Sequence, residues 1–272
     1  MRPPVPLRTV AFGAAMALIL AGCAAATLTR SGALSSYEGM TPANGTVTKS
    51  LVRADKPALA KAKTVQLVPI GFLDTKAAGG APEADRSAIA NALNRALCRD
   101  LSRRFTVVAE GAPADLTVTG AITAVTPTNT TATTGSSVLR IVPLPLPRIP
   151  VGLGGLSAEA EARDANGRQV AALVWARGAD AVTTRARMSA GGDAFELSSS
   201  FSADFATLLR YGSASAPTTV ESVLPSGGDL SYSLTGTPSP ACARFGKGPN
   251  FAGTVSSVFG APLDWTEQKP KQ

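Results

Sequence analysis

The feature that most constrains the fold of this chain is a turn, Asp-Ala-Asn-Gly at 164–167, that separates two strand-like segments. Residues 156–163 and 168–177 flank the turn, and both have the alternation of a half-buried strand over part of their length. An Asn-Gly pair between two such segments is the strongest short-range signal for a β-hairpin. We therefore expect two antiparallel strands here.

In the first strand of this hairpin, three charged residues alternate with alanines. Successive side chains of a strand point to opposite faces, so we expect Glu159, Glu161 and Arg163 to lie on the solvent face while the alanines pack inward. A carboxylate pair for acid–base chemistry or for a divalent cation is the alternative interpretation. The regular alternation favours the solvated face.

Further segments extend the pattern on both sides of the hairpin. Short strand patterns cover 63–70, 105–108 and 115–125, and helical patterns cover 85–104 and 193–212. In the second helix, Asp193 and Glu196 resemble a capping box, and Gly212 is expected to end the helix. The order predicts an α+β fold: a mixed, mainly antiparallel sheet of about five strands with two helices packed on one face, followed by an irregular C-terminal tail.

The first 22 residues are typical of a lipoprotein signal peptide. Arg2 and Arg8 precede an apolar segment at 10–21 that is too short to span a bilayer. The segment ends in Leu20-Ala21-Gly22-Cys23, which resembles the lipobox of bacterial lipoproteins. The alternative is an ordinary signal peptide that ends near a cysteine, but Cys23 stands where the apolar segment stops.

The lipobox resemblance implies that Cys23 is cleaved to the N-terminus and carries acyl groups such as palmitate. Two or three acyl chains would anchor the chain firmly to a bilayer. Ala24 follows the cysteine, where an Asp typically retains Gram-negative lipoproteins at the inner membrane. By that resemblance we expect an outer-membrane location, with the protein facing the periplasm.

Composition divides the remaining chain into three parts. Residues 23–62 show no sustained period and are expected to be a lipidated tether. Residues 63–212 hold all the predicted elements and form the α/β periplasmic domain. Residues 213–272 are rich in Ser, Pro and Gly, and we expect a tail that is partly disordered.

Cleavage would leave Cys98 and Cys242 as two thiols in an exported chain. An even number of cysteines in that setting favours a disulfide, which would tie the tail to the domain. The alternative is that they are two unrelated small apolar residues.

The chain contains no histidine, which excludes Ser-His-Asp and Cys-His catalysis and histidine-ligated zinc. No P-loop, Ser-x-x-Lys or Gly-x-Ser-x-Gly motif is present. We expect no enzymatic activity, cofactor or metal. Removal of Arg2 and Arg8 would lower the formal charge of +7 by two, and so mild an excess does not indicate nucleic-acid binding.

An apolar, proline-rich segment at 138–156 is the least ordinary part of the mature chain. Its proline density excludes a regular helix and suits an extended arm. The arm either covers a sheet edge or contacts a partner or the bilayer. The residues expected to make such a contact are Ile141, Leu144, Leu146, Arg148 and Ile149.

The segment Ser31-Gly32-Ala33-Leu34-Ser35-Ser36-Tyr37, together with Val68-Pro69-Ile70 and the hairpin turn, resembles an uncharacterised bacterial lipoprotein family, domain of unknown function 3313. Members of that family show a Ser-Gly-Phe-Leu-x-x-Tyr motif soon after the lipidated cysteine, and Ala33 here replaces the aromatic residue. The resemblance covers about 31–212 and implies an anchored α/β periplasmic domain, with no catalytic residues to carry over.

These observations predict a membrane-anchored periplasmic lipoprotein with a non-enzymatic interaction or scaffold role. Its expected partners are the lipid bilayer, through acylated Cys23, and an envelope protein. A module that binds a small ligand or lipid is the alternative, although few aromatic residues are available to line a pocket.

Overall fold

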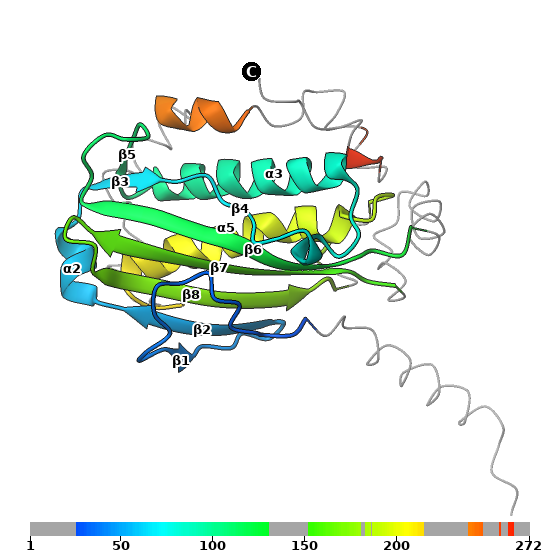
Figure 1. Cartoon of the computed structure of the whole chain (residues 1–272), viewed down its shortest axis with the longest axis horizontal. Helices are drawn as coiled ribbons and strands as arrows, with labels where there is room; N and C mark the ends of the chain where they lie inside the picture. The colour runs from blue at the N-terminus through cyan, green and yellow to red at the C-terminus, as the bar shows by residue number, and fades with distance from the viewer. Residues whose placement is uncertain are drawn as a thin grey trace, which may run out of the picture.

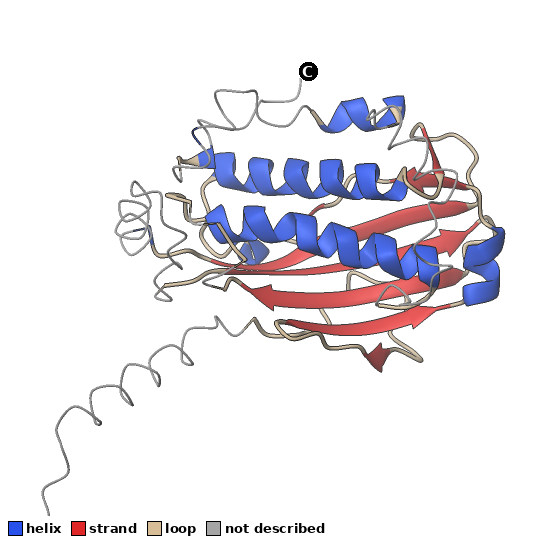
Figure 2. Ribbon diagram, turned by 180° about the vertical axis from the view of Figure 1, so that it is seen from behind, coloured by secondary structure: helices blue, strands red, loops and turns tan. Residues whose placement is uncertain are grey.

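The computed structural model describes residues 26–130, 152–180, 183–185, 187–214, 239–246, 256 and 261–263. These residues form a sheet of eight strands, covered on one face by helices (Figures 1 and 2). The strands are β1 (Thr41–Pro42), β2 (Thr48–Ala54), β3 (Thr64–Leu67), β4 (Gly71–Phe72), β5 (Thr106–Val108), β6 (Leu116–Thr126), β7 (Gly155–Asp164) and β8 (Gln169–Gly178).

The strand order is β1-β2-β8-β7-β6-β3-β5, with β4 also paired to β6. Adjacent strands in the part β1-β2-β8-β7-β6 of the sheet are antiparallel. β3 runs parallel to both β5 and β6, and β4 runs parallel to β6. The mixed α+β architecture is therefore confirmed, but the expectation of about five strands was too low. The missing strands are β1 and β4, which have two residues each, and β2, which was assigned to the tether.

The predicted hairpin is formed by β7 and β8. Gly167 has φ +78°, a backbone conformation that glycine adopts without strain. The backbone N–H of Asp164 donates to the carbonyl of Arg168, and the Asp164 carboxylate accepts from the N–H groups of Asn166 and Arg168 at 3.0 Å each. The side chain of Asp164 thus stabilises the turn by accepting hydrogen bonds from its backbone.

The helices are α2 (Lys56–Lys61), α3 (Glu83–Leu101) and α5 (Gly192–Tyr211), with short 3₁₀ helices η1 (Lys76–Ala78) and η3 (Pro240–Phe245). α3 and α5 lie side by side on the same face of the sheet, as predicted (Figure 2). Their apolar stripes are buried against the inward side chains of the strands. At the centre, Trp175 of β8 contacts the Phe201 ring edge-on, with ring centroids 5.7 Å apart.

The N-terminus of α5 differs from the predicted capping box. Its N-cap is Gly191, which has no side chain to cap the helix, and the hydroxyl of Thr128 accepts the backbone N–H of Asp193 at 3.1 Å. The Asp193 carboxylate instead accepts the N–H of Gly154 at 2.7 Å, and Glu196 pairs with Arg187. Gly212, with φ +61°, ends the helix as predicted.

The tether prediction for 23–62 was wrong for the described part of that segment. β2 pairs with β8 along its whole length, and Leu59 of α2 is buried in the core. The segment lacked a visible period because Lys49 and Arg53 lie on the outer face of an edge-side strand, where side chains are only partly covered. The domain therefore begins before residue 63.

The prediction of an irregular tail was also incomplete. η3 packs on α3, and Cys242 and Phe245 of η3 are buried in the main core. Cys98 of α3 forms a disulfide with Cys242, with an S–S distance of 2.01 Å, so the structure contains the predicted bridge.

Two predictions lie outside the described residues. These are the signal peptide with Cys23, and the contact residues of the arm, Ile141, Leu144, Leu146, Arg148 and Ile149. Among the helices that the structure describes, none has the length and hydropathy needed to cross a membrane.

Candidate functional site

Residues 26–40, here called the N-terminal strap, cross the face of β7 and β8 that is opposite to α3 and α5 (Figure 1). The strap has almost no regular secondary structure. Its Leu34 is buried against Ala172 and Val174 of β8, and Leu28 and Met40 pack around this small cluster. The sheet thus has a second apolar contact layer, separate from the main core.

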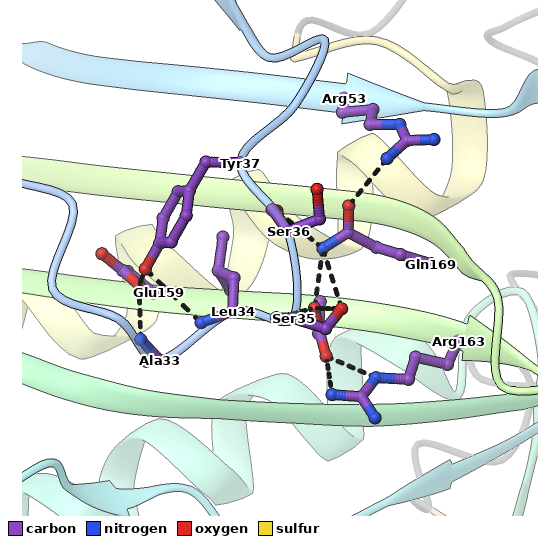
Figure 3. Close-up of polar contacts among 10 residues, drawn as sticks. Ala33, Leu34, Ser35, Ser36, Tyr37, Arg53, Glu159, Arg163 and Gln169 are labelled. Atoms are coloured by element: carbon purple, nitrogen blue, oxygen red, sulfur yellow. Dashed lines mark hydrogen bonds and ion pairs between the residues drawn. The ribbon is translucent and has the colours of Figure 1, made fainter.

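Glu159 of β7 accepts three hydrogen bonds from the strap. One carboxylate oxygen accepts the backbone N–H of Ser31 at 2.6 Å. The other accepts the N–H of Ala33 at 3.2 Å and the Tyr37 hydroxyl at 2.5 Å. The Tyr37 oxygen in turn accepts the N–H of Gly32 at 2.7 Å, so the phenol and the carboxylate together bind the turn at 31–33. Figure 3 shows the contacts of Glu159 with Ala33 and Tyr37.

Glu161 binds the next part of the strap. Its Oε2 atom accepts both the backbone N–H and the hydroxyl of Ser35, at 2.8 and 2.7 Å. The same oxygen accepts the side-chain amide of Gln169 at 2.7 Å, and the other oxygen pairs with Arg163. Gln169 also donates to the carbonyl of Ser36 at 3.0 Å and accepts from Arg53 (Figure 3).

The prediction that Glu159 and Glu161 lie on a solvent face was therefore wrong. Both residues are on the expected side of β7, because the alternating alanines do pack inward, but their exposed fraction is 0%. The strap covers them. A strand's alternation reports which residues share a face, and it does not report what lies over that face.

The environment of Glu161 keeps its carboxylate ionised. Burial raises its pKa, but hydrogen bonds from Ser35, Gln169 and Arg163 outweigh burial and lower the pKa below the ordinary value. The phenol of Tyr37 shows the opposite shift. Burial, followed by the hydrogen bond and the negative charge of Glu159, raises the pKa of Tyr37 above its ordinary value.

These two shifts predict the pH range in which the strap is held. Glu161, with its pKa lowered from 4.5, stabilises the folded state above pH 4.5, and this contribution is lost as the pH falls through the lowered value. Tyr37, with its pKa raised from 10.0, contributes below pH 10.0, and its contribution is lost as the pH rises through the raised value.

Comparison of the wild-type protein with E161Q tests the predicted loss of stability at low pH. The free energy of unfolding of the wild-type protein is expected to exceed that of E161Q at pH 7, and the difference should shrink towards zero as the pH falls below 4.5. Urea denaturation of both proteins at several pH values measures this difference. A difference that stays constant down to pH 3 would contradict the assignment of Glu161.

Sequence reasoning missed most of the residues that hold the strap, namely Ser31, Ala33, Ser35, Tyr37 and Gln169. They carry no catalytic or metal-binding pattern. Backbone N–H groups make three of the contacts with the two carboxylates, and every residue type other than proline offers that donor. The available signal was the Ser-Gly-x-Leu-x-x-Tyr segment itself, which coincides with the strap.

Chemically, this site recognises an extended main chain by charged hydrogen bonds. Such bonds are shorter and stronger than neutral ones. Within the parts of the chain that the structure describes, no group of three or more Cys, Asp or Glu side chains is placed to hold a metal ion. The arrangement therefore supports a site that positions a segment of the chain.

The fold and the strap site define an α+β domain with one face covered by helices and the other by its own N-terminal segment. Residues 29–205 match the model of a family described as "Protein of unknown function (DUF3313)". The match covers more than half of the chain, and the chain belongs to this family.

A comparison with curated proteins gives no match. Among solved structures, the chain is similar to the PelC dodecamer from Paraburkholderia phytofirmans, with 16% sequence identity and a TM-score of 0.35 over 60% of this chain and 97% of that chain. A single-residue variant of the same dodecamer gives 17% identity and a TM-score of 0.34 with the same coverage. Both likenesses are distant, and we infer nothing about this chain from them.

Proposed function

We propose that this protein is a periplasmic lipoprotein, anchored through Cys23 to the outer membrane, whose domain is presented in a fixed orientation to an envelope partner. It acts as a non-enzymatic interaction or scaffold protein. The observation that carries the proposal is the strap, which lies a few residues after the lipobox in the sequence and is bound to the sheet by two buried carboxylates.

The position of the strap limits the distance between the anchor and the domain. The carbonyl of Thr27 accepts the Ser157 hydroxyl at 3.4 Å, so the chain contacts β7 four residues after Cys23. An extended chain spans at most about 3.5 Å per residue, which gives about 14 Å between Cys23 and this contact. A lipidated Cys23 would therefore keep the start of β7 close to the bilayer, which restricts the orientations open to the domain.

A fixed orientation favours an interaction role. A catalytic or ligand-binding domain that serves diffusing molecules gains little from a rigid link to the membrane. A scaffold must present the same surface to its partner each time, and pre-ordering that surface reduces the entropy cost of binding. Val47 and Leu73 are the large apolar side chains that remain exposed on the described surface.

Substitution of the lipobox cysteine tests the anchor. C23A is expected to lose labelling by a palmitate analogue and to move from the membrane fraction to the soluble periplasmic fraction. The matched variant A24D keeps the cysteine, so it should remain labelled and shift to the inner membrane. If C23A stays in the membrane fraction, or if wild-type protein takes up no label, the anchor proposal is wrong.

Photocrosslinking in cells tests the partner. A photoreactive residue at Val47, at Leu73, or at Leu144 of the proline-rich arm should capture one specific envelope protein, identified by mass spectrometry. Glu38, exposed on the strap, is the control position. Only intramolecular products at all three positions would contradict an interaction role. Lipid adducts alone would favour the alternative, a module that binds lipid or a small ligand.

A further inference from the structure

A groove of about 530 Å³ lies on the helix-covered side of the sheet, between the C-terminal end of α5 and the β1–β2 hairpin. The helices cover the central strands, whereas β1 and β2 lie beyond α5 (Figure 2). The residues that line the groove lie along that margin. Its volume is in the range of small-molecule sites. The strap, on the opposite face, takes no part in it.

The walls of the groove are mixed in character. Val52 of β2 and Leu173 and Trp175 of β8 supply an apolar floor. Asp204 of α5 and Lys56 of α2 are the charged residues among those lining it. The remaining lining residues are mostly small, and they belong to the β1–β2 hairpin and to the chain just after α5.

Asp204 is the acidic residue of the groove, and it contacts the apolar floor directly. One oxygen of its carboxylate, Oδ2, accepts the indole N–H of Trp175 at 2.7 Å, and Trp175 itself is only 1% exposed. Burial raises the pKa of Asp204, while the Trp175 hydrogen bond and the positive charge of Arg177 partly oppose that shift. The carboxylate is thus partly desolvated and fixed in direction by a neutral donor.

Arg177, whose positive charge acts on Asp204, makes its hydrogen bonds to other residues. The guanidinium of Arg177 donates to Ser200 at 3.2 Å, to Thr183 at 2.8 Å and to Asp180 at 3.1 Å. No hydrogen bond from a cationic side chain to Asp204 is present among the described residues. A lining carboxylate held by a single neutral donor has the capacity to accept a further, charged donor.

We propose that this groove binds a small primary amine with an apolar body, whose ammonium group donates to Asp204 while its hydrocarbon part packs on Val52 and Leu173. Lys56 lines the same groove, with its stem against Gly212. Its positive charge disfavours a second ammonium group. The site therefore selects monoamines over diamines of similar length, and this ligand goes beyond the interaction role proposed above.

Trp175 provides a direct signal for the test. The chain has two tryptophans, and W265F leaves the indole of Trp175 as the only one. Its N–H hydrogen bond ends on the carboxylate that is expected to take the ammonium, so its resonance in a ¹H–¹⁵N spectrum should shift on binding. Benzylamine is the probe, titrated into the full chain at pH 7.

Three comparisons make the test specific. D204N retains an oxygen that accepts the indole N–H but loses the charge, and it should weaken benzylamine binding at least about tenfold, because hydrogen bonds to charged groups are worth about 1.5–3 kcal/mol. E38Q removes the same charge from an exposed position outside the groove, and it should bind as the parent protein does. Benzyl alcohol, the neutral isostere, and 1,4-diaminobutane should both bind more weakly than benzylamine.

The outcomes are compared for variants whose spectra show them to be folded, and two of the overturning results need the parent protein alone. A saturable shift of the Trp175 indole with benzylamine, lost in D204N and kept in E38Q, supports it. The absence of a saturable shift in the parent protein overturns it. Equal binding of benzyl alcohol to the parent protein overturns it as well, and so does unchanged benzylamine affinity in a D204N protein whose spectrum shows it to be folded.

Discussion

Replacement of both Cys98 and Cys242 by alanine is expected to lower the free energy of unfolding by about 5 kcal/mol, which is the largest effect predicted for this protein. The bridge joins residues separated by 144 positions. In the chain-entropy model, a cross-link that closes so long a loop removes many conformations from the unfolded chain and stabilises the native state accordingly.

The loss should be felt first at η3. Ser239, just before η3, donates its hydroxyl to the carbonyl of Val107 at 3.1 Å, and Arg244 pairs with Glu110 at 2.6 Å. These contacts place η3 over the edge strand β5. Without the disulfide, η3 is held by these two contacts and by buried Phe245, so we expect η3 and the edge strand β5 beneath it to become the earliest sites of exchange.

Urea denaturation of the wild-type and doubly substituted proteins measures the global effect, and hydrogen exchange of 106–108 and 239–246 measures the local one. S102A is the matched control, because Ser102 lies within 3.7 Å of the Cys242 sulfur and its loss leaves the cross-link intact. Alkylation of both cysteines in unreduced wild-type protein would contradict the bridge. A stability change below about 1 kcal/mol would contradict its structural importance.

Substitution of Glu159 by alanine is the second large effect, with an expected loss of about 3 kcal/mol in the free energy of unfolding. The substitution removes the acceptor of two backbone N–H groups and of the Tyr37 hydroxyl. Loss of a charged acceptor leaves these donors unpaired while the strap stays in place, so the strap should detach and let water satisfy them. Detachment would also expose Leu34, Ala172 and Val174.

Hydrogen exchange of 31–37 reports strap detachment, and urea denaturation reports the global loss. E159Q keeps one acceptor oxygen and should fall between the wild type and E159A, while Y37F removes one donor and should cost about 1 kcal/mol. E83Q, which alters an exposed carboxylate on α3, should leave strap exchange unchanged. Full protection of 31–37 in E159A would contradict this prediction, because it would show that the Glu161 and Gln169 hydrogen bonds and the apolar contacts hold the strap without Glu159.

The strands and helices with strong local patterns were predictable from the sequence. The hairpin of β7 and β8 has an Asn-Gly turn, and α3 has Ile89, Leu93, Leu97 and Leu101 at steps of four residues. Both signals are local, because turn chemistry and helical periodicity depend on residues a few positions apart. The strands β1, β2 and β4 lack such signals and form because a neighbouring strand offers them a partner.

The start of α5 also shows that a local sequence pattern does not predict which distant group a side chain binds. Asp193 and Glu196 have the spacing of a capping box. In the structure, however, the Asp193 carboxylate accepts the backbone N–H of Gly154, and the Glu196 carboxylate pairs with Arg187. A local capping pattern is overridden when a buried backbone N–H or a buried arginine needs a hydrogen-bond partner, because leaving either group unpaired is costly. The exposed fraction of Arg187 is only 3%, so an unpaired charge there would be costly.

The resemblance to the family could be recognised from residues 31–37 together with Val68-Pro69-Ile70 and the hairpin turn, but the structural role of 31–37 could not. Ser31, Gly32, Leu34 and Tyr37 match the family motif, and in the structure they form the strap. Their acceptors, Glu159 and Glu161, lie more than 120 residues away, with separations of 128 and 126 for the Ser31 and Ser35 contacts. No local pattern connects them.

By itself, the sequence determined the α+β class, the central hairpin and the apolar stripes of α3 and α5, and it favoured a bridge between Cys98 and Cys242 that the structure contains. The tertiary structure alone decided the number of strands, the burial of Glu159 and Glu161 beneath the strap, and the groove beside Asp204. The physical reason is range: periodicity and turn chemistry act between near neighbours, whereas burial and hydrogen-bond partners depend on which distant segment the fold lays over a given face.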